Sequence, residues 1–147
     1  MEAEIVLYID ANIFLELLLN QASAPDCQRF LSFLETSMPS CIISSFHVFA
    51  IVLVIQHKAK NMQLSKRFLE SLQSYSGISI YHADISTMTA AVDLQVQHHL
   101  DFDDGLAIAA MREMAITKIV SFDAHFDHVS SIKRIGPADA LKELQQP

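Results

Sequence analysis

The sequence is poor in glycine, proline and cysteine, with 3, 4 and 2 of these residues among 147. This scarcity argues against a low-complexity linker and against a turn-rich all-β sandwich. The glycines are also too few for a dinucleotide-binding loop, and no G-x-x-x-x-G-K motif of a P-loop enzyme occurs. Cys27 and Cys41 make no disulfide framework and match no zinc-ligand spacing, so we interpret them as buried thiols in a reducing cytoplasm.

Long apolar runs and positive net charge are missing too. The longest apolar stretch has eight residues, 48–55, whereas a membrane span needs about 20. The acidic start MEAEIVLYID runs directly into a strand pattern, unlike a signal peptide, so we expect a cytoplasmic protein that does not enter a membrane. The net charge of −7 argues against a broad basic surface for nucleic acid. Clustered carboxylates can nevertheless hold cations that meet a phosphate.

Apolar residues, in contrast, are abundant. Hydrophobic residues make up 51% of the sequence and charged residues 18%, which excludes a disordered chain and predicts a large core. The length fits one domain, which we assign to residues 1–147. The mean hydropathy of +0.28 is high for a monomer and predicts that a partner or a second copy covers part of the surface.

Candidate strands and helices alternate along the whole chain. The apolar run IVLYI and similar short runs predict strands at 5–9, 41–43, 78–81, 118–121 and within 130–135. Helical patterns occupy 13–19, 25–37, 46–60, 65–75, 85–98 and 103–114, and a last helix begins at Pro137. The Val- and Ile-rich segment 46–60 also has strand propensity, but its length, its Ser44 or Ser45 cap and its basic end favour a helix. The expected fold class is α/β with a mostly parallel sheet of four or five strands.

Acidic residues follow the predicted strands, at the sheet edge where ligands bind in such folds. Asp10 follows the first strand, and Asp123 follows the strand KIVS with Asp127 four residues later. A further cluster, DFDD, opens the Ala-rich helix with Asp101, Asp103 and Asp104. Taken singly, each is as well explained as a turn residue or helix cap, and we expect Asp103 or Asp104 to cap its helix and Asp101 and Asp127 to be solvated or supporting.

Three acidic sites at one sheet edge are less easily explained by turns alone. Carboxylates held together repel one another unless a cation neutralises them. Oxygen ligands of this kind suit Mg²⁺ or Mn²⁺, and such an ion can promote hydrolysis of a phosphodiester. The acids therefore predict a divalent-metal site.

In order and spacing, these motifs resemble the PIN domain family. The resemblance rests on D-x-N at Asp10 and Asn12, on DFDDGL before the Ala-rich helix, and on VSFDxxFD with IKRIGP near the end. It implies a three-layer α/β/α nuclease fold that cleaves RNA with Mg²⁺ or Mn²⁺. Many members are VapC-type toxins, so it also implies an antitoxin partner and, with the high hydropathy, a homodimer.

Carried over by position, the resemblance makes Asp10, Asp104 and Asp123 the catalytic and metal-binding acids. Ser121 is then the hydroxyl two positions before the last acid, and Asn12 supports the first acid by hydrogen bonding. Asp101, Asp103 and Asp127 are supporting candidates.

One acid of the family is missing. A Glu is expected about six residues after a Ser in the helix after the second strand, which is Ala50 counted from Ser44, or Ile51 with a shift of one. No Glu occurs between Glu35 and Glu70, so no local realignment restores it. The chain is then a natural inactive member, or carries an engineered change at Ala50, or uses a substitute.

Two residues are candidates for that substitute. His47 lies one turn before Ala50, although packing or hydrogen bonding explains it more simply; Glu16 fits a solvent-facing or supporting role better. His125 and His128 follow the last acid, where they either contact a phosphate or belong to a surface loop.

Two functions remain open on the sequence. The first is a metal-dependent endoribonuclease, weakened by the missing acid. The second is an inactive PIN-like module that binds RNA or a protein partner, which the net charge and Ala50 favour. A haloacid-dehalogenase-like phosphatase is disfavoured because Asn12 stands where its second acid belongs, and a receiver domain because Asp10 stands alone.

Overall fold

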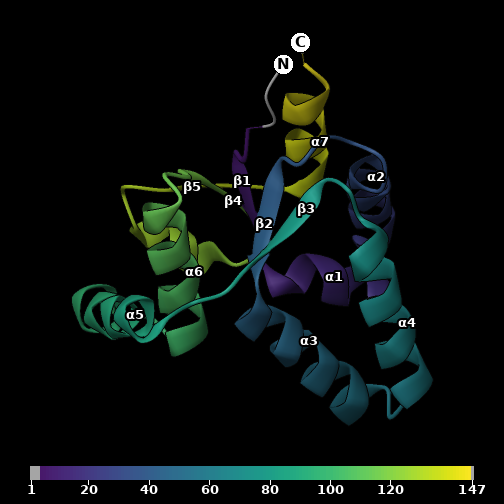
Figure 1. The fold of residues 1–147 in the computed structure, drawn as a ribbon, viewed down its shortest axis with the longest axis horizontal. Coiled ribbons are helices and arrows are strands. Elements are labelled where there is room, and N and C mark those ends of the chain that lie inside the picture. The colour runs from purple at the N-terminus through teal and green to yellow at the C-terminus, as the bar shows by residue number, and fades with distance from the viewer. Residues whose placement is uncertain (1–3, 147) are drawn as a thin grey trace.

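The computed structural model describes residues 4–146, in which helices separate the strands along the chain (Figure 1). The strands are β1 (Leu7–Ile9), β2 (Cys41–Ser44), β3 (Ile78–Tyr81), β4 (Lys118–Val120) and β5 (Lys133–Ile135). The helices are α1 (Ala11–Leu18), α2 (Ala24–Leu34), α3 (Ser45–Lys58), α4 (Met62–Ser74), α5 (Ile85–His98), α6 (Phe102–Glu113) and α7 (Pro137–Gln145), with a 3-10 helix η1 (Ala124–His128).

The five strands form one sheet in the order β3-β2-β1-β4-β5, and all four pairings are parallel. The chain first builds the sheet outward through β1, β2 and β3, and then returns to add β4 on the other side of β1. The order therefore reverses between β1 and β4. In open α/β sheets this switch point is where ligands bind.

Alternation along the strands divides the apolar core between the two faces of the sheet. On one face, Leu7 and Ile9 of β1 pack with α1, α2, α3, α4 and α7; on the other, Tyr8 packs with α5, α6 and η1. Figure 1 shows α5 and α6 on one side of the strands and α1, α3 and α4 on the other. The expected three-layer α/β/α fold is confirmed.

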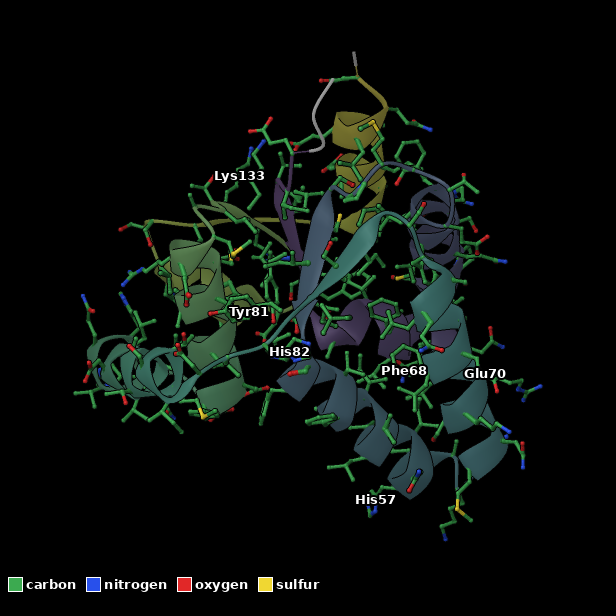
Figure 2. The ribbon with its side chains drawn as sticks, viewed as in Figure 1. His57, Phe68, Glu70, Tyr81, His82 and Lys133 are labelled. Carbon is green, nitrogen blue, oxygen red and sulfur yellow. The ribbon has the colours of Figure 1, made fainter. Side chains whose placement is uncertain are left out.

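Helix α4 shows how the outer helices are amphipathic. Figure 2 shows Phe68 pointing toward α1, where its ring meets Phe14 edge-on at 5.4 Å between centroids, whereas Glu70 points away from the core. Apolar residues at helical spacing are what bury one face and leave the other in water. No helix within residues 4–146 has the length and apolar character that crossing a membrane requires.

Several boundaries differ from the sequence-based prediction. The helix predicted over 46–60 is α3, which spans Ser45–Lys58. Ser44 caps it by accepting a hydrogen bond from the His47 N–H at 3.1 Å. The expected cap at Asp103 or Asp104 is wrong: Asp101 occupies the N-cap position, and the other two lie in the first turn. Neither periodicity nor capping predicted η1, which is too short to carry a helical repeat.

Candidate active site

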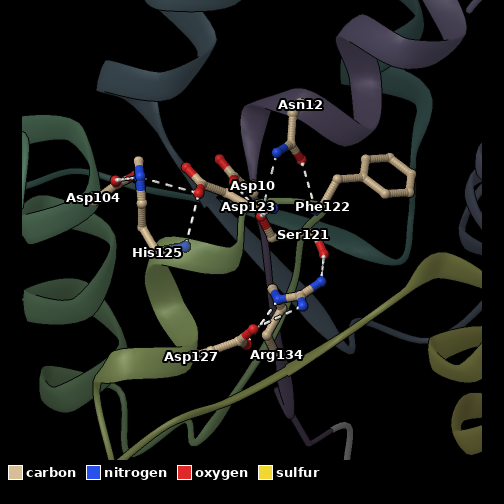
Figure 3. A network of polar contacts seen from close by, with 9 residues as sticks. All are labelled: Asp10, Asn12, Asp104, Ser121, Phe122, Asp123, His125, Asp127 and Arg134. Carbon is tan, nitrogen blue, oxygen red and sulfur yellow. Dashed lines mark hydrogen bonds and ion pairs between the residues drawn. The ribbon is translucent and has the colours of Figure 1, made fainter.

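The predicted acids meet at the switch point of the sheet. Asp10 directly follows β1, Asp123 lies three residues after β4, and Asp104 lies in the first turn of α6. Because β1 and β4 are neighbouring parallel strands, their carboxyl ends open at the same edge. Figure 3 shows Asp10, Asp104 and Asp123 gathered there from these three segments.

The buried hydroxyl of Ser121 connects several residues at this edge. Its Oγ donates a hydrogen bond to Asp10 Oδ2 at 2.5 Å, and it accepts one from the Asp123 N–H at 3.0 Å and one from Asn12 Nδ2 at 3.3 Å. Asn12 therefore supports Asp10 through Ser121 and not by direct contact. Asn12 Oδ1 also accepts a hydrogen bond from the Phe122 N–H, which ties α1 to the segment after β4.

Two of the carboxylates resist ionisation. Burial raises the pKa of Asp10 to about 6, against the hydrogen bond from Ser121, and the charges of Asp123 and Asp103 raise it further. Burial also raises the pKa of Asp104 to about 7, with added repulsion from Asp103, Asp123, Asp10 and Asp101. The fold thus holds acids together at a cost that a cation would remove.

A second grouping brings in a histidine. Asp104, Asp123 and His125 each offer a ligand atom, and these three atoms all lie within 4.8 Å of one another. Asp10 lies beside this group: its charge helps to raise the pKa of Asp104, and the charge of Asp123 helps to raise the pKa of Asp10. Two buried carboxylates, a half-exposed one and an imidazole are donors that fit a divalent ion, so the chemistry of this edge is compatible with the metal that the sequence predicts.

The three supporting acids lie around this centre in different ways. Asp101 and Asp103 are exposed, and their charges act on Asp104. Asp127 instead forms a two-pronged ion pair with Arg134, both contacts at 2.9 Å, and Arg134 Nη1 donates a hydrogen bond to the Ser121 carbonyl at 3.4 Å. Asp127 therefore holds η1 against β5.

His47 is buried in a polar network beside the acids. Its Nε2 lies 3.1 Å from the carbonyl of Asp103, which only accepts, so Nε2 carries the proton. The lone pair of Nδ1 is then an acceptor that the hydroxyls of Tyr8 and Ser44 share, both at 2.7 Å. Both ring nitrogens are engaged, and burial lowers the pKa of His47, so the imidazole is neutral. Its role is structural, which agrees with the expectation that packing or hydrogen bonding explains this residue.

The other proposed substitute, Glu16, is also engaged elsewhere. Its Oε1 accepts a hydrogen bond from the Ser23 N–H at 2.9 Å, where the chain enters α2. This contact ties α1 to α2, so Glu16 serves the connection between two helices.

The two candidate positions of the missing acid, Ala50 and Ile51, differ in burial. Ile51 is fully buried in the apolar core, where a carboxylate would lack any partner. Ala50 is half-buried and lies one turn after His47, on the helix whose imidazole reaches the first turn of α6. Burial in the core thus argues against Ile51, and Ala50 stays the predicted place of the absent Glu.

Sequence reasoning missed two contributors to this site. Tyr8 reads as a core residue of β1, yet its hydroxyl accepts from the Ser44 N–H at 3.1 Å and donates to His47. Arg134 lies in the last strand, and nothing in the sequence links it to Asp127. The sequence predicts His125 as a phosphate contact or a loop residue, and its position two residues after Asp123 is the signal that links it to the acids.

Comparisons with known proteins bear on the family and on the fold. A family model described as PIN domain matches residues 7–132. The crystal structure of VapC20 of Mycobacterium tuberculosis, described as a sarcin–ricin loop cleaving toxin, is similar with a TM-score of 0.68 and 16% identity, over 82% of this chain and 92% of that chain. No curated protein sequence matches the chain.

Two further similar structures are toxin–antitoxin complexes. VapBC2 of Rickettsia felis, bound to a DNA fragment from its promoter, has a TM-score of 0.69 at 12% identity, over 90% of this chain and 98% of that chain. A toxin–antitoxin complex of Klebsiella pneumoniae has a TM-score of 0.65 at 15% identity, over 90% and 97%. At such identities the likeness concerns the fold.

Proposed function

The chain belongs to the PIN domain family, whose members are typically ribonucleases, and on this premise we propose that it is a divalent-metal-dependent endoribonuclease of the VapC toxin type. It would hydrolyse RNA phosphodiester bonds in the cytoplasm, with Mg²⁺ or Mn²⁺, as one PIN domain over residues 1–147. One observation carries the proposal: Asp10, Asp104 and Asp123, from segments far apart in the sequence, meet at the switch point of the sheet.

The residues of the chain have distinct tasks in this proposal. Asp10, Asp104 and Asp123 would hold the ion. Ser121 orients Asp10 and the segment of Asp123 at once, and Asn12 fixes Ser121 in turn. A bound Mg²⁺ or Mn²⁺ would neutralise the carboxylates and supply a Lewis acid for phosphodiester hydrolysis.

The absent Glu supports a second candidate function. Ala50 offers no ligand where the family has a carboxylate, so an inactive PIN-like module that binds RNA or a protein partner also fits. The loss of one carboxylate would weaken metal binding. It would leave the fold unchanged, because α3 forms with Ala50 at that position. Restoring the acid separates the two candidates.

The test is cleavage of a mixed-sequence fluorescent RNA in Mn²⁺, with and without EDTA. If the chain is an active ribonuclease, the parent cuts, and both EDTA and Asp10→Asn reduce cutting by about 100-fold or more, equal to a loss of nearly 3 kcal/mol of transition-state stabilisation. Asp93→Asn, an exposed carboxylate on α5, is the matched control and should cut like the parent.

Ala50→Glu decides between the two candidates. Cutting that appears only in Ala50→Glu would mean that the parent is the inactive module. An unchanged Mn²⁺ titration of Ala50→Glu by calorimetry would contradict the placement of the missing acid at Ala50.

We also propose an antitoxin partner and a homodimer. The similar toxin–antitoxin complexes support the first, since their toxins share this fold. The high mean hydropathy and the exposed apolar side chains Phe49 and Leu53 of α3 support a covered surface. A monomer mass in sedimentation at all micromolar concentrations would contradict the homodimer.

A further inference from the structure

His125 lies beside the acidic centre, on the first turn of η1. Its side chain is 69% exposed, yet Nδ1 is directed to the acids, 3.2 Å from Asp123 Oδ1 and 3.9 Å from Asp104 Oδ2. Figure 3 shows the ring lying between the two carboxylates. The backbone N–H of His125 also donates to Asp123 Oδ1 at 2.9 Å, so the position of the ring is coupled to that of the carboxylate.

These separations match those between ligands of one ion. With metal–ligand distances of about 2.1 Å, neighbouring ligands of an octahedral ion lie roughly 3 Å apart and opposite ones roughly 4.2 Å apart. The separations from Nδ1, 3.2 and 3.9 Å, lie within this range, and all three ligand atoms lie within 4.8 Å of one another. The two separations from Nδ1 are therefore compatible with three ligands of one ion.

The state of Asp104 is an independent reason to expect a ligand here. Its side chain is only 9% exposed, and within residues 4–146 no group donates a hydrogen bond to its carboxylate. Asp10, by comparison, has the Ser121 hydroxyl. A buried carboxylate without a donor is costly, and Figure 3 shows it facing His125.

We propose that His125 Nδ1 is a protein ligand of the metal, together with Asp104 and Asp123, and that this nitrogen biases the centre toward first-row transition ions over Mg²⁺. The inference rests on the proposed function for the presence of a metal at this edge. Imidazole is a good ligand for transition ions, whereas Mg²⁺ strongly prefers oxygen. His125 thereby supplies a ligand in a centre that lacks the family Glu at Ala50.

Pulsed electron paramagnetic resonance of bound Mn²⁺ tests the ligand directly, because it detects nitrogen coordinated to the ion. We expect a nitrogen coupling in the parent, its loss in His125→Ala, and its retention in His128→Ala. His128 is the matched control, since it is an exposed histidine of the same 3-10 helix. A parent spectrum with bound Mn²⁺ and no nitrogen coupling, or a coupling that survives His125→Ala, would overturn the assignment.

Calorimetry with Mn²⁺ and Mg²⁺ tests the ion preference. His125→Ala should weaken Mn²⁺ binding about 10-fold and Mg²⁺ binding less than about 3-fold, because Mg²⁺ gains little from imidazole. His125→Asp should strengthen Mg²⁺ binding by adding an oxygen ligand. Equal losses for both ions in His125→Ala would overturn the preference.

These outcomes remain distinct from failure of the proposed function. If His125→Ala leaves Mn²⁺ binding intact but weakens RNA binding, His125 contacts the substrate and the ligand assignment is wrong, while the ribonuclease proposal stands. If the parent binds no Mn²⁺ at all, both are wrong.

Discussion

Asp104 shows what a single residue contributes to this site. Its pKa is raised to about 7, because burial and four neighbouring acids favour the protonated form. The native state therefore binds a proton more tightly than the unfolded chain, in which a carboxyl titrates near pH 4. In metal-free protein, stability from this group is present below about pH 4 and is lost as pH rises toward 7.

Asp104→Asn removes this penalty. In EDTA at pH 8 we expect the variant to be more stable than the parent by about 2 kcal/mol, and at pH 5 the gain should be much smaller. Urea unfolding at the two pH values measures the difference. Asp93→Asn, whose carboxylate is exposed, should change stability by less than about 0.5 kcal/mol at both. A gain that is the same at pH 5 and pH 8 would contradict the origin in ionisation.

At the scale of elements, His47 joins four segments that carry the site. It lies in α3, contacts Tyr8 of β1 and Ser44 of β2, and donates to the Asp103 carbonyl in the first turn of α6. The neighbouring residue on α6 is Asp104. The imidazole therefore fixes the start of α6 relative to the sheet.

His47→Leu should destabilise the protein by about 2–3 kcal/mol, because the Asp103 carbonyl loses its donor and the buried Tyr8 hydroxyl loses its acceptor. Urea unfolding provides the measurement. The matched control is His57→Leu, an exposed histidine near the end of the same helix, which should change stability by less than about 0.5 kcal/mol. If His47→Leu is as stable as His57→Leu, the network does not hold α6.

Elements that depend on local pattern were predictable from the sequence. Strand 78–81 and helix 85–98 have the predicted bounds, since each has its own apolar period and clear end signals. The start of α6 was not predictable, because Asp101, Asp103 and Asp104 are all residue types that cap helices. Gly105 indicates what decides there: a Cβ at this position would lie 2.6 Å from the Ala91 carbonyl, so close packing of α5 places the first turn of α6.

The acids of the site were predictable for a topological reason, and their partners were not. Parallel strands end at one edge, so Asp10 and Asp123 were expected at the same edge of the sheet. That β1 and β4 are neighbours, which brings the two acids close, is known only from the structure. The direction of a side chain such as Arg134 depends on tertiary contacts across the sheet, which no local pattern encodes. For the same reason the neutral, fully bonded state of His47 became evident only in the structure.

On the scale of the whole molecule, the candidate centre joins the first strand to the last third of the chain. Asp10 belongs to the start of the chain, whereas Asp104 and Asp123 belong to segments added after the sheet order reverses. An ion bound to all of them links these segments, and it binds only the native state because the unfolded chain does not assemble the site. Metal binding should therefore stabilise the fold as a unit.

Thermal unfolding with increasing Mn²⁺ tests this linkage. The melting temperature of the parent should rise with the logarithm of Mn²⁺ concentration, corresponding to about 2.7 kcal/mol at 100 times the dissociation constant. A titration with NaCl at the same ionic strength is the control for screening of the net charge of −7. Asp104→Asn should shift much less with Mn²⁺, since it lacks a ligand, and Ala50→Glu should shift more, since it regains one. An equal shift in the parent and Asp104→Asn would mean that the ion acts on the acidic surface at large, and the three segments would then share no metal.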